Sequence, residues 1–237
     1  GDPLALFLAM RDASPVPFGA FVAGDGFAIA SRSMERFLSW DRLSGRLVTR
    51  PIKGTIARTT GSPNDDARGA KTLRADEKER AEHVMVVDLM RNDLGRVAEV
   101  GSVKVESLFE VEPYAKLAHL VSTVACRTRP DVGLVDVLCA TFPPGSVTGA
   151  PKHTAVRLIE ALERHARGPY TGAIGYVSRS GDLSLAVAIR TAVVENGTAA
   201  YFAGGGIVEA SDPDREVAET DLKAKVFTDA IARLPRT

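Results

Sequence analysis

Alternating apolar and polar positions along the chain indicate a series of short β-strands. Residues 18–22 and 27–31 alternate in this way, and Gly24-Asp25-Gly26 between them favours a tight hairpin turn. Residues 46–50 show the same half-buried pattern just before a proline and a lysine. Further strands are predicted at residues 102–109, 118–127, 170–178, 184–194 and 198–203.

Helical periodicity accounts for much of the remaining chain. Residues 59–69, in contrast, are polar and rich in turn formers, and we expect a loop there that serves as a mobile lid. Gly95 follows a long helical pattern and is expected to take the left-handed conformation that ends many helices. Helices are predicted at residues 3–11, 73–90, 134–140, 152–164 and 213–234.

Composition and charge give no support to a nucleic-acid or membrane partner. The chain has 237 residues, of which 45% are apolar and 25% charged, as in ordinary globular proteins. Lysine and arginine together number 30, as do aspartate and glutamate, so no excess of positive charge favours nucleic acid or an anionic membrane. No apolar run reaches the roughly 20 residues of a membrane span. We therefore expect no nucleic-acid partner and no membrane partner.

Two cysteines, Cys126 and Cys139, lie among apolar neighbours and form no CxxC pattern. Isolated cysteines of this kind are typical of a reducing compartment, where thiols stay free. The sequence therefore predicts a cytoplasmic protein in which both thiols are buried.

Lys53, between Pro51 and Gly54, is the first candidate for chemistry. A nucleophilic lysine must be neutral, and its ordinary pKa near 10.4 requires burial or nearby positive charge to lower it. The alternative is a solvated surface lysine beside a turn. Glu35 follows an earlier predicted strand, so a carboxylate and a lysine could share one sheet edge. The alternative for Glu35 is a surface ion pair with an arginine.

Two predicted helices each carry a pair of glutamates three residues apart, which places each pair on one helical face. The pairs are Glu79 with Glu82, and Glu216 with Glu219. Four such carboxylates would suit Mg²⁺, which prefers hard oxygen ligands. The alternative is two solvated helix faces with ordinary charge. No histidine or cysteine spacing indicates zinc, and no Gly-x-Ser-x-Gly motif indicates an acyl hydrolase.

Two glycine-rich segments favour close approach of a ligand. Residues 142–152 form a glycine-bounded loop that opens a predicted helix, whose free backbone N–H groups can hold an anion. The spacing is not that of a P-loop. Three consecutive glycines at 204–206 follow a predicted strand, where tight packing or ligand approach is their main use.

Several segments together, in order and over nearly the whole chain, resemble the chorismate-utilising enzymes. This family comprises anthranilate synthase component I, aminodeoxychorismate synthase component I, and the isochorismate and salicylate synthases. The most distinctive matches are Pro51-Ile52-Lys53-Gly54-Thr55 and the segment from Gly145 to Lys152. The others are residues 33–37, 82–89, 91–95, 119–122, 170–176, 188–191, 203–208 and 216–223.

The resemblance implies an α+β fold in which two mixed β-sheets pack face to face with helices outside. It implies that residues 1–237 form one chorismate-binding catalytic domain that lacks the N-terminal part usual in the family. Met34 departs from the family pattern, which usually has proline at that position.

The residue at position 53 separates activities within the family, since lysine there is typical of the aminodeoxychorismate synthases and alanine of the anthranilate synthases. The resemblance thus implies Mg²⁺-dependent synthesis of 4-amino-4-deoxychorismate, for folate biosynthesis, from chorismate and ammonia. The ammonia would come from a separate glutaminase subunit. Two alternatives stay open: an anthranilate or isochorismate synthase, and a catalytically impaired chorismate-binding or regulatory subunit.

The resemblance also implies roles for individual residues. Lys53 would attack C2 of chorismate, Glu35 would protonate the departing C4 hydroxyl, and His119 would lie near C4. Mg²⁺ would be held by Glu82 and Glu219, with Glu79 and Glu216 near its waters. Substrate contacts would come from Arg190 and Tyr176 to the enolpyruvyl carboxylate, from Lys223 to the ring carboxylate, and from Thr148 and the backbone of Gly204, Gly205 and Gly206.

Overall fold

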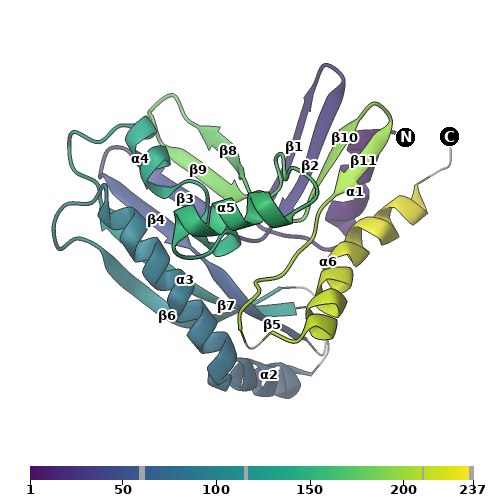
Figure 1. Cartoon of the computed structure of the whole chain (residues 1–237), viewed down its shortest axis with the longest axis horizontal. Coiled ribbons are helices and arrows are strands. Elements are labelled where there is room, and N and C mark those ends of the chain that lie inside the picture. The colour runs from purple at the N-terminus through teal and green to yellow at the C-terminus, as the bar shows by residue number, and fades with distance from the viewer. Residues whose placement is uncertain (59–61, 115–116, 210, 235–237) are drawn as a thin grey trace. The chain divides into compact units, whose positions relative to one another are not determined.

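The structure, a computed structural model of the chain, describes residues 1–58, 62–114, 117–209 and 211–234 (Figure 1). The chain folds into two compact units. Unit 1 comprises Gly1–Met34, Arg167–Ile174 and Val187–Thr237. Unit 2 comprises Glu35–Ala166 and Gly175–Ala186. Each unit therefore draws on segments that are far apart in the sequence.

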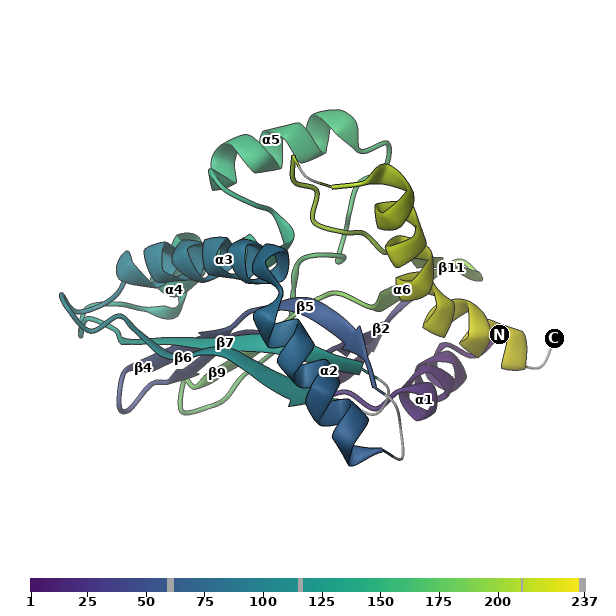
Figure 2. The same cartoon turned by 90° about the horizontal axis from the view of Figure 1, so that it is seen from below.

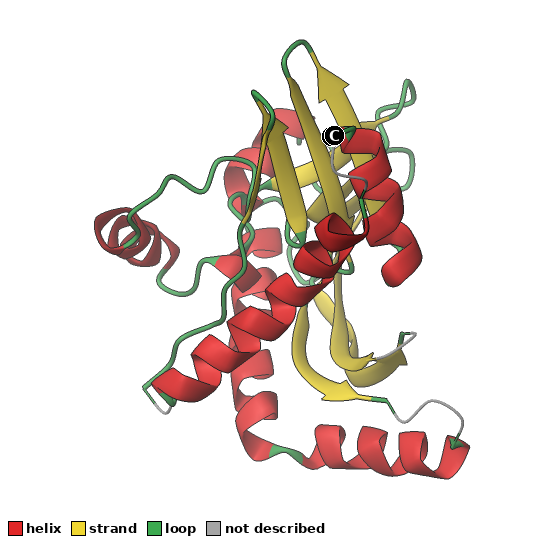
Figure 3. Cartoon of the chain, turned by 90° about the vertical axis from the view of Figure 1, so that its right-hand side faces the viewer, coloured by secondary structure: helices red, strands yellow, loops and turns green. Residues whose placement is uncertain are grey.

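Unit 1 is a four-stranded antiparallel sheet with two helices. The strand order is β1-β2-β10-β11, and β2 pairs with β10 although more than 150 residues separate them. Leu6 and Met10 of α1 are buried against Ala30, Ala192 and Ala230, which form a small apolar core. Helices α1 and α6 lie next to each other beside the sheet (Figure 3). The elements are α1 (Pro3–Ala13), β1 (Phe18–Gly24), β2 (Phe27–Ser33), β10 (Thr191–Glu195), β11 (Thr198–Tyr201) and α6 (Pro213–Arg233).

Unit 2 is built around one strand, β7, in a seven-stranded sheet. The strand order is β5-β7-β4-β3-β9-β8, and β6 pairs with β7 as well. Eight of the eleven residues of β7 are buried, among them the polar His119 and Ser122. The strands are β3 (Arg36–Asp41), β4 (Arg46–Arg50), β5 (Ile52–Ala57), β6 (Lys104–Pro113), β7 (Leu117–Arg127), β8 (Ala173–Val177) and β9 (Leu183–Val187).

The helices of unit 2 include α3, which lies along one face of the sheet (Figure 2). Its buried side chains include Val86, Val87, Met90 and Leu94, whose helical spacing places them on one face. This packing also presents the N-terminal turns of α3 to β5. The helical elements of the unit are α2 (Pro63–Ala75), α3 (Glu77–Gly95), α4 (Leu134–Thr141), the 3₁₀ turn η1 (Gly145–Val147) and α5 (Lys152–Leu162).

The predicted α+β class with two sheets is confirmed, and every strand pair with a described register is antiparallel, where mixed sheets were expected. Helices were correctly predicted near both ends of the chain and at α4 and α5. No helix in the described part of the chain is long and apolar enough to span a membrane.

The expected loop at 59–69 is wrong for its second half, because α2 begins at Pro63. Ser62 caps this helix by accepting a hydrogen bond from the Asp65 backbone, and Asp65 and Asp66 give it an acidic first turn. Residues 59–61 of that loop lie outside the described residues. The helix expected at 73–90 is divided at Asp76, whose side chain caps α3 through the Glu79 backbone at 2.9 Å.

Three further expectations are corrected by the structure. The strand predicted at 184–194 is broken between β9 and β10, where Arg190 takes a positive φ of 53°. Gly95 is the last helical residue of α3 and has no left-handed backbone. Cys126 is buried as expected, but Cys139 on α4 is exposed, since it lies on the face turned away from the buried Val137 and Ala140.

Candidate active site

A bulge in β5 positions Lys53. Lys53 pairs with Leu120 of β7, but Thr55 pairs with the very next residue along β7, so Gly54 is an extra residue in the ladder. Gly54 has φ 84°, and a Cβ there would lie 3.0 Å from Oε2 of Glu79. Only glycine accommodates both requirements without strain. The sequence therefore fixes a kink beside the lysine.

The Lys53 side chain reaches α3. Its Nζ lies 3.0 Å from Oε2 of Glu82, and its side chain is 24% exposed. The backbone kink at Gly54 and the packing of α3 on β5 bring these two residues together. Lys53 is therefore largely covered and paired with a carboxylate, unlike a freely solvated surface lysine.

Glu79 and Glu82 form a pair of carboxylates on the first turns of α3. Glu82 is 11% exposed at its side chain, and its Oε1 lies 3.7 Å from Nζ of Lys78. Burial raises the pKa of Glu79, and the neighbouring charge of Glu82 raises it further. Two partly desolvated carboxylates that repel each other are stabilised by a cation placed between them.

Glu35 is nearly completely buried, with 5% of its surface exposed, at the entrance to β3. Burial raises its pKa to about 7, although hydrogen bonds from Ser146 and the Ile52 backbone and the charge of Lys53 oppose the rise. A carboxyl with this pKa is present in both protonation states near neutral pH. It can therefore donate a proton and take one back.

His119 is buried on β7 and directed at the same bulge. Its Nδ1 lies 2.9 Å from Oγ1 of Thr55 and 3.3 Å from the carbonyl oxygen of Gly54. Since the carbonyl can only accept, Nδ1 carries the proton in that contact. The ring also packs edge-on against Tyr114, with centroids 5.4 Å apart. These contacts fix both the tautomer and the orientation of the imidazole.

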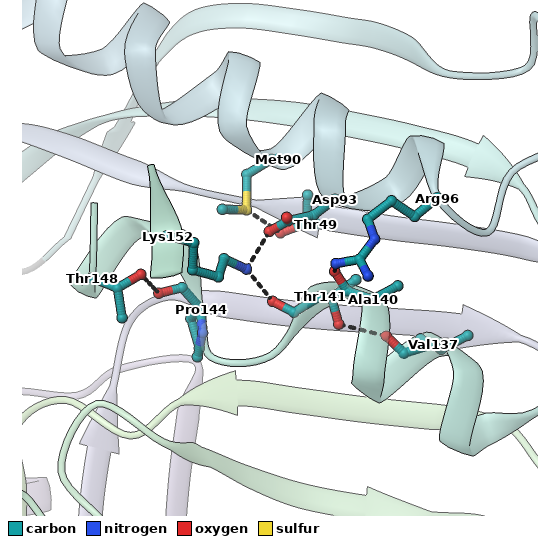
Figure 4. Close-up of polar contacts among 10 residues, drawn as sticks. All are labelled: Thr49, Met90, Asp93, Arg96, Val137, Ala140, Thr141, Pro144, Thr148 and Lys152. Carbon is teal, nitrogen blue, oxygen red and sulfur yellow. Dashed lines mark hydrogen bonds and ion pairs between the residues drawn. The ribbon is translucent and has the colours of Figure 1, made fainter. Parts of the chain in front are cut away.

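The loop that leads into α5 holds Ser146 against Glu35. Nζ of Lys152 donates to Oδ2 of Asp93 at 2.6 Å and to the carbonyl of Thr141 at 2.7 Å, so the loop is tied to α3 and α4 (Figure 4). Oγ1 of Thr148 donates to the carbonyl of Pro144 at 3.1 Å. The hydroxyl of Thr148 thus stabilises the loop, while a substrate contact for it stays a prediction.

Unit 1 gathers most of the other candidates around α6. Arg190, which follows β9, donates from Nη1 to the backbone carbonyl of Lys223 at 2.7 Å. Nζ of Lys223 lies 2.6 Å from Oε1 of Glu219 and donates to the carbonyl of Gly204 at 2.9 Å. The basic pair expected to bind substrate carboxylates therefore shares one cluster with an expected metal ligand.

The backbone at Gly204 and Gly205 lies close to other side chains of unit 1, including Glu216 of α6. A Cβ on Gly205 would lie 2.6 Å from Oε2 of Glu216, and one on Gly204 would lie 3.1 Å from the hydroxyl of Tyr170. The two glycines thus leave room for side chains of this unit itself. The predicted approach of these glycines and Gly206 to a ligand stays a prediction.

The structure sorts the predicted residues by unit. Within unit 2 it brings Lys53, Glu82, Glu79, Glu35 and His119 around the β5 bulge. Among the described residues no group of three or more acidic, histidine or cysteine side chains is arranged to hold a metal. Tyr176 and Thr148 also belong to unit 2, and Tyr176 on β8 is 66% exposed. Arg190, Lys223, Glu216, Glu219 and the glycines at 204–206 belong to unit 1.

Sequence reasoning missed two contacts of this site. Ser146, inside the glycine-bounded loop, hydrogen-bonds to Glu35, and only the position of the loop hinted at it. His83, on the apolar face of α3, is completely buried beside Glu82 and hydrogen-bonds to Ser122 of β7. A histidine on the apolar face of a helix, next to a candidate ligand, is the signal that was available.

Comparison with known proteins matches residues 1–229 to the family model of chorismate binding enzymes. An aminodeoxychorismate synthase of Streptomyces griseus is 47% identical over 94% of this chain and 30% of that protein. Anthranilate synthase component 1 of Aquifex aeolicus is 43% identical over 98% of this chain and 46% of that protein. The crystal structure of anthranilate synthase component I from Streptococcus pneumoniae superposes with a TM-score of 0.86, at 41% identity, over 96% of this chain and 50% of that one.

This chain therefore spans half or less of the length of these relatives. The match nevertheless covers nearly all of its own residues, including both units and every residue of the candidate site. The chain belongs to the family of chorismate binding enzymes.

Proposed function

We propose that this chain carries the catalytic site of an enzyme that replaces the C4 hydroxyl of chorismate with an amino group, giving 4-amino-4-deoxychorismate. The observation that carries the proposal is Lys53, largely covered on a glycine bulge, with Nζ 3.0 Å from Glu82. Glu35, a carboxyl able to donate a proton near pH 7, responds to the charge of the same lysine. Similarity to an aminodeoxychorismate synthase over 94% of the chain supports the assignment.

The carboxylates of α3 fit a magnesium ion by their chemistry. Glu79 and Glu82 offer hard oxygen donors, and the repulsion that raises the pKa of Glu79 would be relieved by a divalent cation. Glu82 already attracts two lysine ammonium groups. Glu216 and Glu219 would add two further carboxylates of the same kind. When bound, Mg²⁺ would neutralise the ring carboxylate of the substrate and stabilise charge as the ring electrons shift.

Lys53 would act as the nucleophile once its ammonium group has released a proton. A bond forms between Nζ and C2, the ring double bonds shift, and the C4–O bond breaks. Ammonia then forms the C4–N bond, the double bonds shift back, and the C2–N bond breaks to release Lys53. Chorismate and ammonia are consumed, and the amino product and water are formed.

Glu35 would donate and take back the proton that these reaction steps require. In its neutral form it donates to the departing C4 hydroxyl, so that the oxygen leaves as water. The carboxylate then takes up the proton that ammonia loses on bonding to C4. The hydrogen bond from Ser146 keeps the carboxyl in one orientation throughout. His119, oriented through Nδ1, is proposed to lie near C4.

The basic residues of unit 1 would bind the two carboxylates of chorismate. The guanidinium of Arg190 suits a bidentate contact with the enolpyruvyl carboxylate, to which Tyr176 would also bind, and Lys223 would contact the ring carboxylate. Backbone N–H groups at 204–206 and Thr148 would complete the contacts. We propose that ammonia comes from a separate glutaminase subunit.

A second candidate is anthranilate synthesis, which the 43% identity to the Aquifex aeolicus anthranilate synthase component favours. Both reactions start from chorismate and ammonia, but in our proposal only the amination at C4 uses a covalent lysine. Lys53 at the centre of the site therefore favours amination at C4.

The proposal is tested by incubating the chain with chorismate, Mg²⁺ and ammonium salts and identifying the product by chromatography and mass spectrometry. We expect 4-amino-4-deoxychorismate from the natural chain. Lys53→Ala should lower kcat by about 100-fold or more, the lower end of what a positioned catalytic side chain contributes. Lys78→Ala, which removes the more exposed lysine on Glu82, is the matched control and should leave kcat within about threefold. Anthranilate as the main product, or equal rates in both variants, would contradict the proposal.

A further inference from the structure

His83 is a completely buried polar residue to which the proposed reaction gives no role. It lies on the face of α3 that packs against β5 and β7, one residue after Glu82. Its Nε2 lies 2.6 Å from Oγ of Ser122 on β7. A buried imidazole with so close a partner is held in one orientation.

Ser122 can hold His83 in the tautomer that carries its proton on Nδ1. The backbone N–H of Phe109 donates to Oγ of Ser122 at 3.1 Å. Oγ is an acceptor in that contact, and its own proton is available for Nε2 of His83. When Ser122 donates to Nε2, the ring proton of a neutral imidazole lies on Nδ1. The ring of Phe109 packs edge-on against the imidazole, with centroids 5.6 Å apart, and closes the other side of the pocket.

The other ring nitrogen of His83, Nδ1, is buried and makes no hydrogen bond to the described residues. Helix α3 packs against β5, and the backbone of Lys53 on β5 is near enough to act on the imidazole as a hydrogen-bonding group. Gly54 interrupts the hydrogen-bond ladder between β5 and β7. A side chain from α3 can therefore take the place of a missing partner for the β5 backbone at this bulge. The adjacent carbonyl, that of Gly54, is met in the same way by Nδ1 of His119.

We infer that His83 is a positioning residue for Lys53, anchored through Nε2 to Ser122 and supporting the Lys53 backbone carbonyl through its Nδ1–H. Two histidines would then support the two successive carbonyls of the bulge, His119 from β7 and His83 from α3. The bulge sets the direction of the Lys53 side chain, so His83 would control the aim of Nζ without touching the substrate. The inference rests on the proposed function of Lys53.

The proposed hydrogen bond from His83 to the Lys53 carbonyl predicts which substitutions of His83 retain function. Asparagine can place an amide N–H where Nδ1 lies, whereas glutamine reaches the position of Nε2. Phenylalanine keeps the ring and its contact with Phe109 but loses both hydrogen bonds. A displaced nucleophile lowers the rate of the chemical step more than it lowers substrate binding. The variants should therefore differ in kcat rather than in KM.

The experiment compares H83F, H83N and H83Q in the full chain, with T49V as the matched control. Thr49 is also buried beneath α3, where its hydroxyl donates to the sulfur of Met90, but it lies on β4. We expect H83F to lower kcat by about 10- to 100-fold with KM within about threefold. H83N should recover most of kcat, and H83Q should recover less. T49V should leave kcat within about threefold at a comparable loss of thermal stability.

Hydrogen exchange of the β5 backbone is the second measurement, and it does not require turnover. Exchange at Gly54 and Thr55 should be faster in H83F and near the natural rate in H83N, with β3 unchanged in both. This comparison decides the inference even if the natural chain forms no aminated product, which would refute the proposed function alone. Equal kcat in H83F and T49V, or recovery in H83Q but not H83N, would overturn the inference. If H83F does not fold, the comparison of H83N with H83Q decides it.

Discussion

At the scale of single residues, Glu35 can act as a proton donor because its burial raises its pKa more than its hydrogen bonds and Lys53 lower it. Two hydrogen bonds and a nearby lysine favour its charged form, yet removal from water outweighs them and holds its pKa at about 7. A surface glutamate, by contrast, would be charged at neutral pH and could not act as an acid. The same burial that makes the group reactive also makes its charged form costly.

The first prediction concerns the pH dependence of amination. Glu35 must be protonated to release the C4 hydroxyl, so kcat should fall as the pH rises above about 7, the pKa of this carboxyl. Glu35→Gln should lower kcat by roughly 10² to 10⁴, because the amide holds no proton to donate, and should remove this limb of the profile. Initial rates between pH 5.5 and 9 with saturating chorismate measure both effects. An unchanged profile in the variant would contradict this role.

The second prediction concerns stability. The folded state keeps the Glu35 proton up to a pKa of about 7, whereas in the unfolded chain the carboxyl titrates near its ordinary value of 4.5. Stability from this group therefore falls as the pH rises through that interval, and the loss is complete above about 7. Glu35→Gln should raise the free energy of unfolding at pH 8 by up to about 3 kcal/mol, and by less at pH 5.

Denaturant unfolding at the two pH values checks this difference. Glu160→Gln, an exposed substitution on α5, is the control and should change stability by less than about 0.5 kcal/mol at either pH. Destabilisation by Glu35→Gln at pH 8 would show that the charged carboxylate is well solvated or well paired in the folded protein. It would also remove the basis for a proton donor at this position.

At the scale of elements, periodicity predicted most helices and strands because each depends on neighbours within a few residues. The prediction was wrong where composition allowed two interpretations. Ser62, Asp65 and Asp66 are common in loops, but the same residue types cap and begin helices, as they do at α2. The bulge at Gly54 was beyond prediction, since it depends on the register between β5 and a strand more than 60 residues away.

The third prediction tests how α3 and the loop before α5 are joined. Asp93 is 7% exposed at its side chain and pairs with Lys152, and burial raises the pKa of Asp93 against the effect of the lysine. Lys152→Met would leave a buried acid without its partner and should destabilise the protein by about 3–5 kcal/mol at neutral pH. Arg91→Ala breaks an exposed ion pair with Asp88 on the same helix and should cost less than about 1 kcal/mol.

Thermal or denaturant unfolding at pH 7 measures both variants. Because the loop also carries Ser146, Lys152→Met should shift the pH above which kcat falls, whereas Arg91→Ala should not. Similar stability losses in the two variants would mean that Asp93 and Lys152 are no better coupled than a surface pair.

At the scale of the whole molecule, the candidate chemistry is divided between the two units. Unit 2 holds the lysine, the proton donor and one pair of glutamates, and unit 1 holds Arg190, Lys223 and the other pair. The sequence was sufficient to identify these residue types and their family. It could not supply distances, because residues from every quarter of the chain contribute.

The fourth prediction concerns the proposed magnesium ion. Removal of divalent ions with EDTA should abolish amination, and added Mg²⁺ should restore it. Glu82→Gln and Glu219→Gln should each raise the Mg²⁺ concentration for half-maximal rate by about tenfold or more, since each removes one charged oxygen ligand. Glu160→Gln is again the control. A normal Mg²⁺ requirement in either glutamate variant would exclude that residue as a ligand.

The unequal exposure of the two cysteines has a practical consequence. The thiol of Cys126 is buried and its pKa is raised to about 11 by that burial, whereas Cys139 is exposed on α4. The reactive form of cysteine is the thiolate, so a maleimide dye should attach at Cys139 and spare Cys126. The natural chain thus offers a single attachment point in unit 2. One cysteine introduced in unit 1 would allow energy transfer to report whether chorismate changes the separation of the two units.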